Sequence, residues 1–510
     1  MEINWLTPAE RRVWRAFPTG EVVDFRTEGD RDPALGAGWG PERRVRAEVV
    51  RAVLLDGPRR DGEIPALRLA GARITGELNL RYATADCAIL LGDCFFDEVP
   101  NLYGTQFRQL NLGGSALPGL TASAVRVDGV LRLTGCRVRG PVRLAAARVS
   151  GALFLDGAEI TAAPDPAPAG GPDDLDAPDG APDGAAGPEA LLQLNHATVG
   201  DDLWAPGLRV EGQMRLGGAS VTGLVGLDDA VLTAPGRTAL DAQTLAVGTD
   251  LRAARLRVRG RIDLRGARIP GQLNLTEARL SQPGGVALRA SSCVVGELWL
   301  RAAAPVEGSV NLRRSQLELL HVAPEVWPER VHLDGLTYGT LAPHESAERR
   351  LAVLERDVDG YVPYAYEQLT ASYRRIGDDA AARTVQLAKQ RRQRRGLAWY
   401  ARLWGHVQDL TVGYGFRPMR AVTWMLSLLA VASAAYAVRR PRPLKADESP
   451  DFNPVFYSLD LLLPIIDFGQ ERAFTPEGGW HQGLSYVLII TGWILATTVI
   501  AGVTRAVSRQ

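Results

Sequence analysis

The chain has 510 residues, long enough for two to four domains, and its 58 basic residues balance its 58 acidic residues. This zero net charge excludes a protein that is steered as a whole toward nucleic acid or another polyanion. The cysteines Cys87, Cys94, Cys136 and Cys293 show no metal-ligand spacing, so we expect reduced thiols and no disulfides.

Residues 1–63 predict a helical cap. No apolar core followed by a cleavage site is present, so this segment does not have the pattern of a signal peptide. Thr7, followed by Pro8 and by an acidic first turn, is typical of a helix N-terminus. Residues 41–55 place valines on one helical face and predict a second helix. The pair should cover the apolar end of whatever repeat follows.

Residues 64–341 repeat. The repeat is marked by glycines 11 residues apart at Gly129, Gly140 and Gly151, and by a 48-residue spacing at Gly200/Gly248, Gly212/Gly260 and Gly223/Gly271. Apolar residues come in pairs two apart, such as Leu131/Leu133 and Val142/Leu144, and such pairs point to one side of an extended segment. Four such edges close a squared coil of 22 residues, stretched to 24 where the 48-residue repeat operates. We expect the glycines at corners that need close backbone approach or positive φ.

The segments LNLRYA, LRLTGC, IDLRGARI and LNLTEARL resemble the A-(D/N)-L-x-x pattern of the pentapeptide-repeat proteins. The resemblance extends from about Ile64 to Leu341 and implies a right-handed, four-sided parallel β-helix. At this coil length it would have about 11 coils and measure about 50 Å. The alternative, a parallel sheet of βαβ units, would need helix-length segments between the strands, and the sequence has none there.

Residues 162–190 interrupt the repeat with a stretch rich in Pro, Ala, Gly and Asp. Such a composition buries almost nothing, so a disordered acidic loop is expected, with an acidic docking site as the alternative. His321 and His332 stand one 11-residue unit apart and resemble a metal pair, but no carboxylate or cysteine falls at a matching repeat position. We therefore predict no metal and no cofactor.

Residues 342–418 predict a helical hairpin and a basic linker. The run AYEQLTASYRRIGDDAAARTVQLAKQRRQRR resembles one tetratricopeptide-like helical hairpin. Basic and aromatic residues follow it, as is typical beside anionic lipid headgroups. The predicted lipid-interface residues are Arg391, Arg392, Arg394, Arg395, Trp399, Tyr400 and Trp404. Nucleic-acid binding is disfavoured because no aromatic interleaving or recognition motif accompanies the charges.

Residues 419–510 predict a membrane domain. The runs 421–438 and 484–503 contain no charged residue and are long enough to span hydrocarbon. Together with the missing signal peptide and the reduced cysteines, they favour a multi-pass protein of the cytoplasmic membrane with both termini in the cytoplasm.

A short apolar helix is expected at 453–466, between the two spans, because Asn453 and Pro454 are typical of a helix start. Span, short helix and span resemble the two-span ion-channel module that some pentapeptide-repeat proteins carry. The residues that align with its filter are Pro464, Ile465, Ile466, Asp467, Phe468, Gly469 and Gln470. Only the aromatic residue and the second glycine match a potassium filter. Residues 411–415 read TVGYG, which is identical to the potassium-channel filter sequence. This string precedes the first span, so it cannot line a pore between the two spans.

The expected function is that of a membrane-anchored cytoplasmic β-solenoid with an ion-channel-like two-span module. Its assembly as a cation-conducting tetramer would place four Asp467 carboxylates at the outer mouth. The first alternative is a non-conducting anchored scaffold, in which 453–466 is an interfacial helix and the solenoid binds an unknown protein partner. The second alternative is an oxidoreductase. Proteins of this kind sometimes carry the oxidoreductase label. The sequence has no dinucleotide fingerprint, phosphate loop or nucleophile elbow, so we predict no catalytic residues.

Overall fold

The computed structural model describes residues 5–27, 32–163, 190–394, 418–445, 450–463, 466–476 and 478–507. The chain divides into two compact units, Met1–Gln368 and Leu369–Gln510. The predicted acidic loop at 162–190 lies almost wholly outside the described residues, and so does the filter-like string at 411–415.

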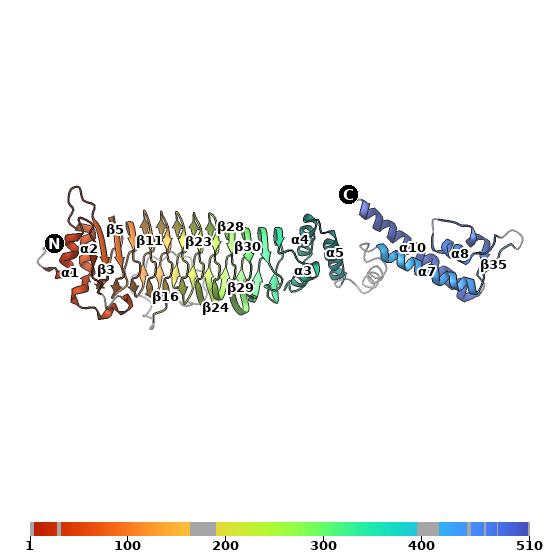
Figure 1. Ribbon diagram of the computed structural model, residues 1–510, viewed down its shortest axis with the longest axis horizontal. Coiled ribbons are helices and arrows are strands. Elements are labelled where there is room, and N and C mark those ends of the chain that lie inside the picture. Colours follow the sequence, from red (N-terminus) through yellow and green to blue (C-terminus); the bar gives the residue numbers. More distant parts are fainter. Residues whose placement is uncertain are drawn as a thin grey trace, which may run out of the picture. The chain divides into compact units, whose positions relative to one another are not determined.

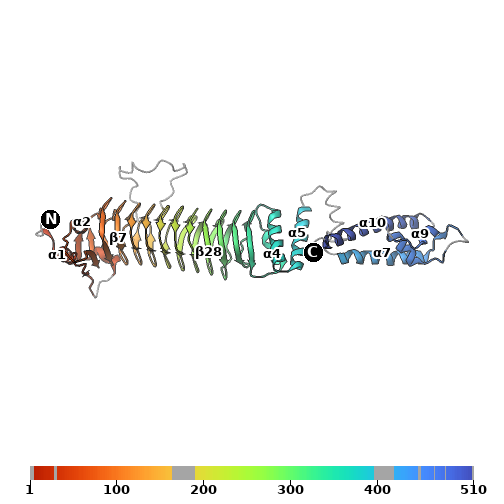
Figure 2. The same ribbon diagram turned by 90° about the horizontal axis from the view of Figure 1, so that it is seen from above.

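The first unit is built on a parallel β-solenoid of about 11 turns, which confirms the β-solenoid part of the predicted fold class (Figure 1). Its strands pair in parallel with strands one coil away, as in β10 with β14 and β12 with β16. Seen from above, the strands follow one another as a regular stack (Figure 2). A parallel stack of this kind is consistent with the resemblance to pentapeptide-repeat proteins.

The solenoid strands belong to two sheets. The first sheet contains β1 (Val23–Asp24), β3 (Ala66–Ala70), β5 (Thr84–Gly92), β7 (Gln106–Asn111), β10 (Arg126–Val127), β11 (Leu131–Arg132), β14 (Arg148–Val149), β15 (Leu153–Phe154), β18 (Thr198–Val199), β19 (Leu203–Trp204), β22 (Ser220–Val221), β23 (Val225–Gly226), β25 (Ala246–Val247), β26 (Leu251–Arg252), β28 (Arg268–Asn274), β30 (Val294–Leu300), β32 (Gln316–Val322) and β34 (Thr337–Ala342). The second contains β2 (Arg44–Arg46), β4 (Arg73–Thr75), β6 (Phe95–Phe96), β8 (Ala116–Leu117), β9 (Leu120–Thr121), β12 (Arg137–Arg139), β13 (Val142–Arg143), β16 (Glu159–Thr161), β17 (Leu192–Gln193), β20 (Arg209–Val210), β21 (Met214–Arg215), β24 (Val231–Asp241), β27 (Arg257–Asp263), β29 (Arg279–Arg289), β31 (Glu307–Asn311) and β33 (Arg330–His332).

Each sheet bends into two faces, which gives the coil four sides. Strand β7 pairs with β10 through its first residues and with β11 through its last ones. Strand β24 in the same way pairs with β20 and, further along, with β21. We call the four sides the β10, β11, β12 and β13 faces, after the strand of one regular coil that lies in each.

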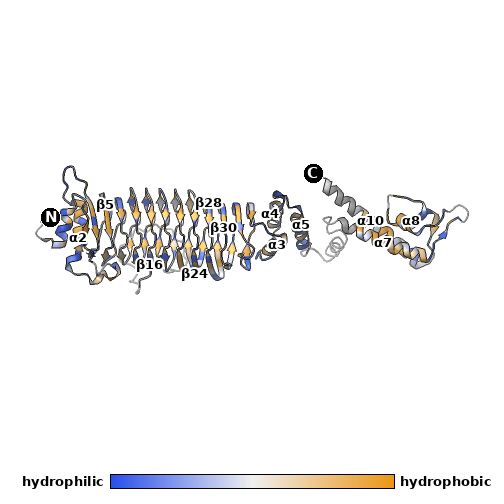
Figure 3. Ribbon diagram, viewed as in Figure 1, coloured by the Kyte–Doolittle hydropathy of each residue, from blue (hydrophilic) through white to orange (hydrophobic). Residues whose placement is uncertain are grey.

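The predicted inward pairs form the core. Leu131 and Leu133 are buried, and so are Val142 and Leu144. Figure 3 shows hydrophobic residues recurring from coil to coil along the stack. Backbone bonds join successive coils, for example from Leu133 N to Phe154 O at 2.8 Å. The apolar period predicted from the sequence therefore marks the residues that fill the interior.

Coil length differs from the prediction in the second half of the solenoid. Ser220 pairs with Ala246 and Ala246 with Arg268, so successive coils take 26 and 22 residues rather than a uniform 24. The four extra residues of the longer coils lie where register shifts occur, between Thr233 and Leu240 in β24 and between Ser281 and Leu288 in β29. Both irregularities fall at the corner between the β12 and β13 faces. The extra residues at this corner leave the strand pairing on the β12 and β13 faces in place.

The periodic glycines serve close approach of the backbone. A Cβ at Gly200 would overlap the carbonyl oxygen of Ser150, and one at Gly248 would overlap that of Thr222. Neither residue has positive φ. The left-handed positions of the turns lie elsewhere and are taken by glycines such as Gly135 and also by residues such as Ala146. Gly200 and Gly248 are therefore needed for close backbone approach and not for positive φ.

The N-terminal cap is partly as predicted. Helix α1 (Pro8–Ala16) starts at Thr7, whose side chain accepts a hydrogen bond from Glu10 N. The second predicted helix, at 41–55, is wrong in its first part. Residues Pro41–Arg43 form the 3₁₀ helix η3, after η2 (Pro33–Gly38), and β2 precedes helix α2 (Ala47–Asp56). The alternation of Val45 with exposed or half-exposed arginines suits β2, which pairs with β4.

Among the described residues between the solenoid and position 394 there are three helices, one more than the predicted hairpin. They are α3 (Ala347–Leu354), α4 (Pro363–Arg375) and α5 (Asp379–Arg394), and the boundary between the two units falls within α4. Helix α3 carries the buried Arg350, whose guanidinium donates to Val322 O at 2.6 Å and to Pro343 O at 2.7 Å. The apolar end of the stack is therefore closed partly by a charged side chain that bonds to backbone carbonyls.

The second unit also contains α7 (Pro418–Val438), α8 (Pro454–Leu462), α9 (Gln470–Ala473) and α10 (Gly479–Val507). The short strands β35 (Arg442–Pro443) and β36 (Phe474–Thr475) pair antiparallel. Helix α8 contacts both α7 and α10, and these two also contact each other.

The close approach at the glycines can be tested by adding one methyl group. We expect Gly248→Ala to lower the free energy of unfolding by about 1–3 kcal/mol, because the new Cβ must displace the backbone of the preceding coil. Gly217→Ala is the matched control, because the nearest atom to its Cβ would be Gln243 O at 3.9 Å. Denaturant unfolding followed by circular dichroism measures both variants. Equal stability of the two would contradict the role given to Gly248.

Candidate functional site

The predicted spans at 421–438 and 484–503 coincide with α7 and most of α10. Among the described residues, no helix combines the length and the apolarity that crossing a membrane requires. Both helices nevertheless expose large apolar side chains. These include Trp424, Leu426 and Val431 on α7, and Tyr486, Val487, Ile490 and Trp493 on α10.

The short helix expected at 453–466 is present as α8 and ends earlier than predicted, at Leu462. The side-chain oxygen of Asn453 accepts hydrogen bonds from Val455 N at 2.9 Å and from Phe456 N at 3.3 Å, which confirms the predicted start. Of the filter-like residues, Pro464 and Ile465 lie outside the described residues.

Asp460 organises the segment that follows α8. Its buried carboxylate accepts hydrogen bonds from Phe468 N at 2.6 Å, Gln470 N at 2.7 Å and Glu471 N at 3.1 Å. The last two N–H groups open helix α9, where the helix dipole also favours a negative charge. Sequence reasoning missed this role. A signal was present, since an acid inside an otherwise apolar helix must find donors when it is buried.

The other filter-like residues lie in this turn. Gly469 adopts a left-handed backbone, with φ of 81°. Asp467 accepts from Gly469 N at 2.8 Å and pairs with Arg472 at 3.0 Å. The Gln470 side chain is buried and bonds to Asn453 N and Asp451 O, while Ile466 and Phe468 are exposed. Residues 466–470 therefore form a turn that is bonded to Asp460 of the preceding helix α8.

Gly492 of α10 lies against the end of α8. A Cβ at Gly492 would overlap the carbonyl oxygen of Leu462. The glycine therefore lets α10 approach the C-terminus of α8 within the same chain. The buried rings of Tyr436 and Tyr457 meet edge to face nearby, with centroids 4.9 Å apart.

The predicted lipid-interface residues are only partly described. Arg391 and Arg392 lie in the last turns of α5, exposed and half-buried respectively, and Arg394 ends that helix. Arg395, Trp399, Tyr400 and Trp404 lie outside the described residues. The basic and aromatic cluster therefore stays a prediction from the sequence.

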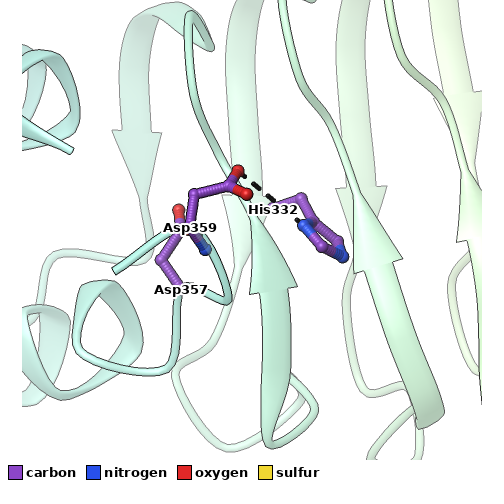
Figure 4. A group of neighbouring side chains, drawn as sticks. All are labelled: His332, Asp357 and Asp359. Atoms are coloured by element: carbon purple, nitrogen blue, oxygen red, sulfur yellow. Dashed lines mark hydrogen bonds and ion pairs between the residues drawn. The ribbon is translucent and has the colours of Figure 1, made fainter. Parts of the chain in front are cut away.

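A second group of chemically capable side chains lies at the end of the solenoid. His332 in β33 faces Asp357 and Asp359 from the loop after α3 (Figure 4). One candidate ligand atom from each residue lies within 4.8 Å of the other two. His332 Nδ1 is 3.8 Å from an Asp359 oxygen, is buried, and has no hydrogen-bond partner.

The two carboxylates have different surroundings. Asp357 is buried and accepts from Leu333 N at 3.1 Å and from Asp359 N at 2.9 Å. Burial is the main cause that raises the pKa of Asp357. Asp359 is exposed and pairs with the Arg313 guanidinium through both oxygens, which lowers the pKa of Asp359.

This group was missed because both acids lie beyond the repeats, where no repeat position points to them. The local signal was the run Asp-Val-Asp-Gly at 357–360, which concentrates oxygen ligands in a turn. His321 and His332 do not form a pair, since they lie in different sheets. His321 instead stacks on Trp299, with ring centroids 4.8 Å apart.

The β11 face carries large outward side chains. Phe154 and Trp204 are neighbours on it, and the Arg132 guanidinium lies 4.2 Å from the centre of the Phe154 ring. Further along, Trp299 donates through Nε1 to Glu297 at 2.8 Å. Aromatic residues and arginine are enriched at protein interfaces.

The chain was compared with family models, with curated proteins and with solved structures, and none of the three comparisons gave a match. The structure itself establishes a parallel β-solenoid that is consistent with a pentapeptide-repeat-like fold.

Proposed function

We propose that the protein is an anchored scaffold, with a solenoid that binds a partner and a C-terminal unit that associates with a lipid bilayer. The observation that carries the proposal is the apolar, outward surface of α7 and α10. Residues 421–438 and 479–503 contain no Asp, Glu, Lys or Arg, and Ile490 is 61% exposed and Val487 56% exposed. Large apolar patches of this kind are typical of membrane or protein contacts. The predicted placement in the cytoplasmic membrane, with both termini in the cytoplasm, is part of this proposal.

The bilayer association predicts that full-length protein floats with liposomes in a density gradient. We expect Val487→Asp together with Ile490→Asp to abolish flotation, because each charge costs about 3 kcal/mol in hydrocarbon. Ile64→Asp with Val294→Asp is the matched control, since these residues are exposed apolar residues of the first unit. Wild-type protein that stays at the bottom of the gradient would contradict the anchor.

The β11 face supports the scaffold part of the proposal. Its half-buried aromatic residues and its arginines offer contact area without a catalytic constellation. The face is rigid because its strands are held in register by backbone bonds on both sides. Its partner is expected to be a protein, since flat aromatic and arginine-bearing surfaces suit protein contacts more than small ligands, which bind in concave pockets.

A photo-cross-linking residue at Arg252, exposed on the β11 face, should give one reproducible adduct in native membranes. The same residue at Arg257, exposed on the β12 face, is the control and should give none. Adducts of equal yield from both positions, or from neither, would contradict the choice of face.

Cation conduction by a tetramer is the second candidate function. The observation that favours it is α8, a short capped helix that contacts both α7 and α10. Backbone that ends such a helix at membrane depth must be buried in protein or line a water-filled cavity. Asp467 supplies the negative charge at the end of this segment, and Arg472 offsets part of it.

Single-channel recording of reconstituted full-length protein tests this candidate. We expect Asp467→Asn to lower cation conductance and Arg472→Gln to raise it, because the first variant removes the ring of charge and the second unmasks it. Silent bilayers from protein that is demonstrably oligomeric would leave only the anchored scaffold.

A further inference from the structure

The end of the solenoid brings together three metal-ligand side chains from two separate segments. His332 comes from β33, the last strand of the second sheet, and Asp357 and Asp359 come from the loop after α3. We propose that these three side chains bind one divalent transition-metal ion, of the Zn²⁺ or Mn²⁺ class, through His332 Nδ1 and one oxygen of each carboxylate.

The three ligand atoms lie slightly farther apart than the ligands of one bound ion. The ligand atoms lie within 4.8 Å of one another, whereas ligands about 2.0–2.2 Å from one ion lie roughly 3–4 Å apart. A shift of about 1 Å closes the difference. Asp359 can make it, because it is about a third exposed and lies in a loop.

His332 supplies the observation that points to a missing ligand. Its Nδ1 atom is buried and no hydrogen bond reaches it. A buried ring nitrogen without a partner is rare, because it has lost its contacts with water and gained none in return. The nearest carboxylate oxygen stands 3.8 Å away, too far for a hydrogen bond. An ion between the imidazole and the carboxylates fills this gap.

The carboxylates have capacity left for an ion. Each oxygen of Asp357 accepts one backbone N–H bond and keeps a second lone pair. These two bonds hold the carboxylate in place, as outer partners do for metal ligands. Asp357 is buried, and an ion would supply the opposite charge that a buried carboxylate needs.

The donor set selects the class of ion. Imidazole nitrogen suits Zn²⁺ and the late transition metals, while carboxylate oxygen suits Mn²⁺ as well as Mg²⁺ and Ca²⁺. A set with one nitrogen and two oxygens therefore favours Zn²⁺ or Mn²⁺ over Ca²⁺, which takes six to eight oxygen ligands. Three protein ligands leave further coordination positions open to water or to a partner's side chain.

Arg313 competes with the ion. Its guanidinium pairs with both oxygens of Asp359. Metal binding must loosen this ion pair, so removal of Arg313 should strengthen the metal site. A purely structural role of the three ligands would predict no such gain.

Equilibrium dialysis of untagged full-length protein against Zn²⁺ or Mn²⁺ alone tests the proposal. We expect about one equivalent of bound metal, and a Kd at least about tenfold weaker in His332→Ala, since loss of outer partners alone costs that much. His321→Ala is the matched control, because this histidine is also half-buried but lies in the other sheet, and it should bind as wild type does. Arg313→Gln should bind more tightly than wild type.

Three results would overturn the proposal. They are no saturable binding by the wild type, equal loss of binding in His332→Ala and His321→Ala, and tighter binding of Ca²⁺ than of Zn²⁺ or Mn²⁺. Where His332→Ala fails to fold, Arg313→Gln still decides, since unchanged affinity in that variant contradicts the placement of the ion beside Asp359. Thermal unfolding adds a second measure, because an ion that joins β33 to the 357–359 loop should raise the Tm with metal concentration.

Discussion

Backbone N–H groups of each coil donate to carbonyls of both neighbouring coils, as Arg257 N does to Ala230 O of the preceding coil. Leu264 N donates to Arg289 O, and Leu312 N donates in the same way to His332 O. The ladder has no natural end, because the last coil still presents unpaired groups and an apolar cross-section. The rest of the first unit is arranged around closing these two ends.

The C-terminal end is closed with polar atoms. Leu333 N, which would meet a carbonyl of the next coil, donates to the Asp357 carboxylate instead. Val331 N donates to Arg356 O, and Val358 N donates back to Val331 O, so the 356–358 segment imitates one more strand. This explains why a carboxylate is buried beside His332. The arrangement that ends the ladder is also the one that assembles the three metal-ligand side chains.

The N-terminal end is closed mainly with apolar surface. Val49, Val50 and Val53 of α2 are fully buried, and β2 begins the second sheet before the recognisable repeat starts. The buried Glu10 of α1 holds Arg46 through bonds of 2.8 and 2.9 Å. In the second unit, a buried carboxylate has a comparable task, since Asp460 binds the N–H groups that open α9. The buried carboxylates of Asp357 and Asp460 therefore both accept hydrogen bonds from backbone N–H groups that would otherwise lose their partners.

Much of the architecture follows from the sequence alone. The apolar pairs such as Leu131/Leu133 predict the core, and Thr7 and Asn453 predict the starts of α1 and α8. These features are readable because each is encoded within a few residues, by a period of two or by a side chain that caps its own helix. The solenoid is the most predictable part, since each coil repeats the same local information.

Only the tertiary structure decided which distant residues meet. The 48-residue period is compatible with two coils of 24 residues, and the strand register divides it into 22 and 26. Gly248 and Gly492 both look like turn or packing glycines in the sequence, yet each is needed because a particular carbonyl lies against it. Two contacts depend on the path that the chain takes after a helix. One brings His332 to Asp357 and Asp359, and the other brings Asp460 to the turn at 468–471. Local propensity and repeat period carry no information about such returns, because the partners are chosen by burial and unpaired backbone groups in the folded chain.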